Sequence, residues 1–146
     1  MSRVFHLARR FVGSLSRRPP SAVEVEWALA HLRDEEAVLW GAMPVADRRH
    51  SLVVARRFVD LRPSASEPEI AAALLHDVGK TDCGLGTLGR VVATVIGPRG
   101  ARMRAYHEHE EIGARMLLGI GSDPATVDLV RGAGPAAGAL RAADDV

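Results

Sequence analysis

The sequence predicts an all-α fold. Apolar residues recur three and four positions apart in most segments, and proline or glycine stands between these segments. No segment alternates apolar and polar residues over enough positions to form a convincing strand, and no internal repeat is present. A chain of 146 residues is long enough for one domain with a sizeable core.

Composition argues against a membrane-spanning protein and against a disulfide framework. Charged residues make up 25% of the chain, the net charge is +1, and no apolar run approaches the ~18 residues of a membrane span. The N-terminus lacks the continuous apolar core of a secretory signal, so we expect a cytoplasmic protein. The single cysteine, Cys83, has no internal disulfide partner and is interpreted as a small loop residue, with a metal-adjacent thiol as the alternative.

Residues 1–20 are predicted to form a basic amphipathic helix followed by a proline break, and residues 21–146 the helical domain. Residues 3–18 carry five arginines and no acid, while apolar residues recur among them at helical spacing. We expect the apolar face to pack on the domain. Contact of residues 3–18 with a membrane surface, nucleic acid or a protein partner is the alternative.

Helix boundaries follow from capping residues, prolines and glycines. Ser21 with Glu24 fits a capping box, Asp47 is expected to cap a helix, and Ser66 precedes a first turn that contains Pro68. Trp27 and Trp40 are expected in the core, and the inward residues of the Asp47 helix are expected to be Leu52, Val53, Ala55, Val59 and Leu61. The expected helices cover about 21–32, 34–43, 47–62, 67–77, 85–96, 101–118, 123–131 and 136–146.

The run from Ala71 to Lys80 ends an apolar helix on His76 and Asp77. An imidazole and an ionised carboxylate buried beside leucines would each carry a desolvation penalty of several kcal/mol, which a divalent cation would compensate. Gly79 is expected to end the helix with a positive φ. Lys80 is the only lysine in the chain and would suit a phosphate beside the metal.

Four strings of the sequence resemble the HD-domain superfamily, over about residues 47–146. The strings are Arg49-His50-Ser51-Leu52 with Val54-Ala55, then Ala72-Ala73-Leu74-Leu75-His76-Asp77-Val78-Gly79-Lys80, then His109-Glu110-Glu111-Ile112-Gly113-Ala114, and Leu140-Arg141-Ala142-Ala143-Asp144. The resemblance implies an HD-type helical bundle and a metal-dependent phosphohydrolase. It also implies that the metal ligands are His50, His76, Asp77 and Asp144.

His109 is a fifth candidate ligand. Residues two apart on a helix point ~200° apart, so His107 and His109 cannot both face one metal in a regular helix. His109 is chosen because it matches the third string, and Asp144 is preferred to Asp145 because it follows the alanine pair of the last string.

Imidazole and carboxylate ligands suit Mn, Fe, Co, Ni or Zn better than magnesium alone. Two-metal members of the family usually carry further histidines before the last aspartate. Residues 120–143 contain none, which favours one ion over two.

The resemblance predicts hydrolysis of a nucleotide or another small phosphoester by a metal-activated water. Asp77, Lys80 and Glu111 are the candidate catalytic residues. Lys80 would stabilise charge and Glu111 would position the water, with a solvated surface acid as the equal alternative for Glu111. The competing hypothesis for the whole protein is a degenerate HD module that binds a nucleotide or a protein partner without catalysis.

Overall fold

The structure is a computed structural model that describes residues 18–80 and 108–145. Several sequence predictions lie outside these ranges, namely nearly all of the basic N-terminal helix, the helix expected over 85–96, residues 101–107 of the helix expected over 101–118, Cys83 and His107. Within the described residues no helix is long and apolar enough to span a membrane.

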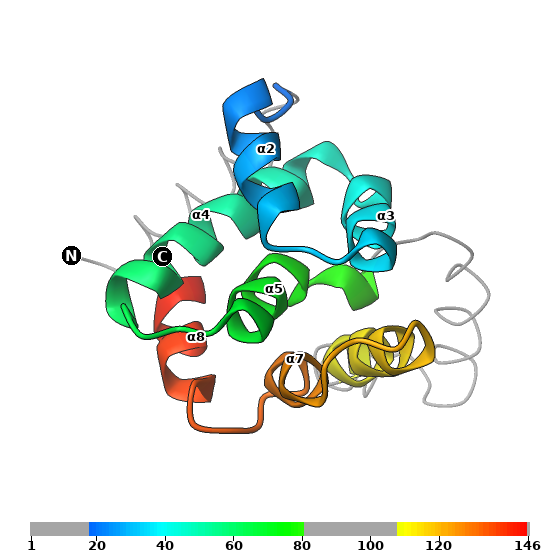
Figure 1. The fold of residues 1–146 in the computed structure, drawn as a ribbon, viewed down its shortest axis with the longest axis vertical. Coiled ribbons are helices and arrows are strands. Elements are labelled where there is room, and N and C mark those ends of the chain that lie inside the picture. Colours follow the sequence, from blue (N-terminus) through cyan, green and yellow to red (C-terminus); the bar gives the residue numbers. More distant parts are fainter. Residues whose placement is uncertain (1–17, 81–107, 146) are drawn as a thin grey trace, which may run out of the picture.

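The described chain is all-α, as the sequence predicts, and contains no strand (Figure 1). Most of its elements are short and are joined by brief turns. In chain order they are α2 (Ala22–Ala30), α3 (Asp34–Ala42), α4 (Val45–Leu61), α5 (Glu67–Leu75), the 3₁₀ turn η1 (Val78–Lys80), a helix over residues 108–119, α7 (Pro124–Val130) and α8 (Ala137–Asp144).

Local capping explains where several helices begin. Ser66 and Glu69 form the reciprocal capping box at the start of α5, since the Ser66 hydroxyl accepts from the Glu69 amide at 3.3 Å and the Glu69 carboxylate accepts from the Ser66 amide at 2.9 Å. Ser21 accepts from the Glu24 amide at the start of α2, and Asp123 accepts from the Ala125 amide at the start of α7.

Two predicted helix boundaries are wrong. Helix α4 begins at Val45 with Pro44 as its N-cap residue, so Asp47 lies inside the first turn and does not cap the helix. The fixed φ of proline suits the entry to a helix, which moves the start two residues earlier. Helix α5 ends at Leu75, so His76 and Asp77 lie in the turn that leads into η1.

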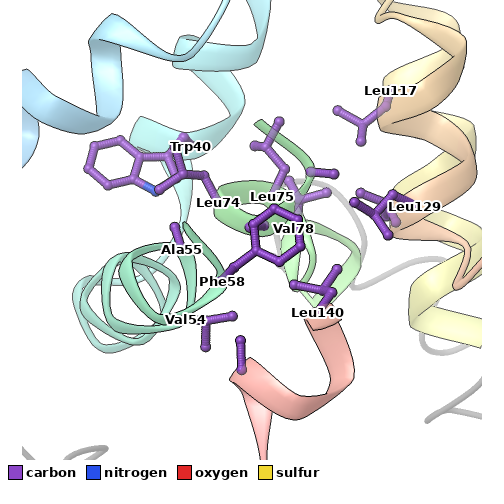
Figure 2. Packing of buried hydrophobic residues seen from close by; sticks show 14 of the residues in the cluster. Trp40, Val54, Ala55, Phe58, Leu74, Leu75, Val78, Leu117, Leu129 and Leu140 are labelled. Atoms are coloured by element: carbon purple, nitrogen blue, oxygen red, sulfur yellow. The ribbon is translucent and has the colours of Figure 1, made fainter. Parts of the chain in front are cut away.

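Helix α5 lies near the middle of the bundle and is buried from Ile70 to Leu75 (Figure 1). It packs against α4, α7 and α3, and α4 packs in addition against α8. Figure 2 shows the side chains that fill the space between these helices. They include Trp40, Phe58, Leu74, Leu75, Val78, Leu117, Leu129 and Leu140.

The inward side of α4 differs from the prediction. Val53 and Leu61 are 53% and 54% exposed, so both predictions are wrong. The buried residues of α4 are Ser51, Leu52, Val54, Ala55 and Phe58. Trp40 is buried as expected, whereas Trp27 is half-buried and carries the guanidinium of Arg56 4.1 Å from its ring centre.

Replacing Ser51 with alanine is expected to lower the free energy of unfolding by about 1–3 kcal/mol, the cost of an unsatisfied buried donor. The Trp40 indole N–H donates to the Ser51 hydroxyl at 2.9 Å, and this hydroxyl donates to the Arg48 carbonyl at 2.7 Å. Urea unfolding followed by tryptophan fluorescence would measure the loss. In a Trp40→Phe background the same change should cost clearly less, and an equal cost in both backgrounds would contradict the explanation.

Candidate metal centre

Three side chains that could hold a metal ion meet between α4, the end of α5 and α8. They are His50, His76 and Asp144, and one ligand atom from each lies within 4.8 Å of the other two. The His50 Nε2 and Asp144 Oδ1 atoms are 2.9 Å apart, and His76 Nε2 lies 3.4 Å from the same oxygen. Asp145, the alternative ligand considered from the sequence, is exposed at the end of α8.

Each of these side chains lies within a described helix or immediately after one. His50 lies in the second turn of α4, the helix that packs against both α5 and α8. His76 immediately follows the last residue of α5, and Asp144 is the last residue of α8. The cluster therefore forms where the ends of α5 and α8 approach the beginning of α4.

The orientation of His76 indicates that its ring needs a positive partner. Its Nδ1 donates to the Ala73 carbonyl at 2.7 Å, which turns the buried Nε2 toward the carboxylates of Asp77 and Asp144, each 3.4 Å away. This Nε2 makes no hydrogen bond of good geometry within the described residues. In a neutral imidazole its lone pair would face two anions, so a proton or a cation must lie there. The residues present therefore fit a bound metal ion.

Asp77 and His109 adjoin this group of three. One Asp77 oxygen faces His76, while the other lies 3.2 Å from Lys80 Nζ and 3.9 Å from His109 Nε2. The structure thus brings all five predicted ligands into one neighbourhood, although only His50, His76 and Asp144 form the mutually close group. The ligand roles of Asp77 and His109 stay predictions.

Gly79 acts differently from the prediction. The described glycines with positive φ are Gly121, Gly132 and Gly134, so Gly79 does not end the helix by that conformation. A Cβ atom at Gly79 would overlap the carbonyl oxygen of His109 and lie 2.8 Å from the Gly113 nitrogen. Glycine is therefore needed for close approach of η1 to the 108–119 helix, which carries His109 toward Asp77.

Glu111, the predicted water-positioning residue, is engaged at the surface. Arg131 donates to both of its carboxylate oxygens, at 2.9 and 3.4 Å, and Arg115 lies 3.5 Å away. The bonds from Arg131 lower the pKa of Glu111. None of its hydrogen bonds or ion pairs among the described residues reaches the three-residue group. These contacts favour the alternative of a surface acid.

Sequence reasoning missed Asp47 as a possible site residue. Burial raises the pKa of Asp47, and the nearby Asp77 carboxylate raises it further. Lys80, His50 and His76 act on it in the opposite direction. Its position three residues before His50, on the same side of a helix, is the signal that could have found it.

The metal-free protein is expected to lose stability as the pH rises above about 6.5. Burial alone would lower the pKa of His76, but the facing Asp144 and Asp77 carboxylates raise it above its ordinary value of 6.5. The folded state therefore keeps a proton that the unfolded state releases. This stabilisation is complete below pH 6.5 and is lost as the pH passes the raised pKa.

At acid pH, Asp144 makes the stability of the protein depend on pH in the opposite direction. Burial alone would raise its pKa, but the hydrogen bond with His50 and the facing His76 imidazole hold it well below the ordinary value of 3.8. The resulting stabilisation is present above pH 3.8 and is lost as the pH falls through the lowered pKa.

Urea unfolding with a chelator should show the decline in stability above pH 6.5 that His76 causes, and His76→Gln should flatten it. A stability that rises between pH 6.5 and 8.5 would contradict the assignment.

The arrangement joins two imidazoles, a carboxylate and an adjoining aspartate–lysine pair in one largely buried cluster. Such a donor set binds divalent transition metals, and Lys80 adds a cation at its edge. Comparison of the chain with protein-family models, with curated proteins and with solved structures finds no match.

Proposed function

We propose that the protein is a metal-dependent phosphohydrolase or phosphodiesterase that acts on a small phosphoester, with nucleotides as the first candidates. The observation that carries the proposal is the buried His76 Nε2, which faces the carboxylates of Asp77 and Asp144 without a hydrogen bond of good geometry. The resemblance to the HD-domain superfamily supports the same assignment through the strings around His50, His76, His109 and Asp144.

His50, His76 and Asp144 would hold one ion, with Asp77 and His109 as further ligands. Mn, Fe, Co, Ni and Zn all suit this mixture of imidazole and carboxylate. One ion is favoured over two because residues 120–143 offer no further histidine. When bound, the cation would lower the pKa of a coordinated water toward neutrality and stabilise charge on a phosphoryl oxygen.

Lys80 would bind the phosphate of the substrate. Its side chain is 43% exposed, and its ammonium is held 3.2 Å from an oxygen of Asp77 at the edge of the cluster. This position lets the ammonium meet an incoming phosphate while Asp77 fixes its direction. A point charge on a flexible stem suits a phosphate that changes its geometry during hydrolysis.

The test uses the full chain, stripped with a chelator and reloaded with Mn, Co or Ni. Metal content is measured first, and hydrolysis is then followed with nucleoside monophosphates, cyclic dinucleotides and bis(4-nitrophenyl) phosphate. We expect one equivalent of metal and turnover of at least one phosphoester that the chelator abolishes. Absence of metal-dependent turnover on the whole panel would reject the hydrolase.

A binding module without catalysis is the second candidate, and the engagement of Glu111 favours it. Arg131 and Arg115 occupy this carboxylate, so a water-positioning group expected from the sequence is not directed at the cluster. Calorimetric titration with the same nucleotides would separate the two functions. Saturable binding that survives His76→Ala and Asp77→Ala, without hydrolysis, supports the binding module.

A further inference from the structure

Asp47 lies on the side of α4 that faces the metal-ligand cluster. His50, Ser51 and Val54 follow it by three, four and seven positions and share that side of the helix. Ser51 and Val54 are completely buried, and His50 contacts Asp144. The Asp47 carboxylate therefore occupies a position on the inward side of α4 where a capping role does not explain it, because Pro44 is the N-cap residue.

The charges that act on the Asp47 carboxylate are those of the cluster. Asp77, Lys80, His50 and His76 all act on it electrostatically. Among residues 18–80 and 108–145 the Asp47 carboxylate forms no hydrogen bond and no ion pair. A half-buried anion that is repelled by Asp77 is unfavourable unless a further positive group balances it.

A count of charges among the described residues favours a divalent cation as that positive group. When a bound cation keeps both imidazoles neutral, the carboxylates of Asp47, Asp77 and Asp144 face one described ammonium, that of Lys80. Two negative charges are then left without compensation, which is the charge that one divalent cation neutralises. Without Asp47, the same cation would leave the cluster positively charged.

We propose that Asp47 is a further functional residue of this centre, whose carboxylate accepts a hydrogen bond from the attacking water and supplies negative charge that favours the cation. The first part rests on the proposed hydrolase function, whereas the second needs only metal binding. Carboxylates that hydrogen-bond to groups around a metal, without ligating it, typically change metal affinity or activity 10–100-fold when they are removed.

The experiment compares three full-length variants. Asp47→Asn removes the charge while keeping the shape, and Asp47→Glu keeps the charge. Asp34→Asn is the matched control, because Asp34 is an exposed acid in the first turn of α3 and is equally subject to the helix dipole. Co²⁺ affinity is measured by titration of the visible absorption, and hydrolysis of bis(4-nitrophenyl) phosphate is measured at saturating Co²⁺.

We expect Asp47→Asn to weaken Co²⁺ binding roughly tenfold or more and to lower kcat by about 10–100-fold, while Asp47→Glu recovers most of both. Asp34→Asn should leave both unchanged. If Asp47 only stabilised its helix, the two asparagine variants would lower the metal-free Tm alike and bind Co²⁺ like the parent. That result would overturn the proposal.

Failure of the proposed function has a different signature. A parent protein that binds Co²⁺ without hydrolysing any ester rejects the hydrolase and the attacking-water role, while the affinity comparison still decides the charge role. A parent that binds no Co²⁺ rejects both. Unchanged affinity and unchanged kcat in Asp47→Asn reject the role of Asp47 alone.

Discussion

Replacing His76 with alanine is expected to weaken Co²⁺ binding by about 100- to 1000-fold, the loss of roughly one ligand's share of the binding free energy. His76 is the ligand with the least freedom to be replaced. Its ring is buried, its Nδ1 is fixed on the Ala73 carbonyl, and its Nε2 lies 3.4 Å from both Asp77 and Asp144. Alanine would leave these carboxylates without the imidazole that faces them.

His31→Ala is the matched control for this loss. His31 is a partly buried histidine that is also paired with an acid, Glu67, at 2.6 Å. It lies at the end of α2 and is not a member of the three-residue group. Isothermal titration of chelator-stripped protein would compare the two variants with the parent. A His76→Ala protein that binds Co²⁺ within threefold of the parent would remove the metal centre from consideration.

Replacing Gly79 with alanine is expected to cost at least about 3 kcal/mol of unfolding free energy, at the upper end of what overpacking costs. The new Cβ would overlap the His109 carbonyl oxygen and crowd the Gly113 nitrogen. Both obstacles are backbone atoms, so no side chain can rotate away. The overlap is removed only if the 108–119 helix moves away from η1. This movement would also carry His109 away from Asp77.

Gly41→Ala is the control. The same substitution is expected there to change the free energy of unfolding in the opposite direction. Nothing lies within 4 Å of a Cβ built at Gly41, which is inside α3. Alanine should therefore stabilise the protein there by roughly 0.5–1 kcal/mol, because glycine is a poor helix residue. Urea unfolding of both variants gives the comparison, and a Gly79→Ala protein as stable as the parent would show that η1 and the 108–119 helix are not in such close contact.

The sequence predicted best the features that depend on a few neighbouring residues. The N-cap role of Ser66, the start of α7 after Asp123 and the all-α class follow from local hydrogen bonding and helical spacing. Val53 and Leu61 were misplaced because the inward side of α4 depends on which helices pack against it. That information is tertiary, since α5 and α8 come later in the chain.

In the candidate site, too, some features were predictable from the sequence and others depend on tertiary contacts. The resemblance selected His50, His76 and Asp144, which the structure brings together from distant parts of the chain. The sequence predicts a positive φ at Gly79 because glycine permits one, whereas the structure requires glycine there because the 108–119 helix lies so close. The sequence predicts a cap at Asp47, because it shows the place of this residue at the start of a helix but not the charges that act on it.

The contact of His50 with Asp144 joins residues separated by 94 positions. An ion held by both side chains would act as a reversible cross-link that closes this long loop. A disulfide that closes a loop of that length stabilises the folded state by about 4–5 kcal/mol, because it lowers the conformational entropy of the unfolded chain. We expect a comparable effect from the bound ion. The cluster would then hold α4 and α8 together. The lifetime of the folded protein would depend on the concentration of available metal.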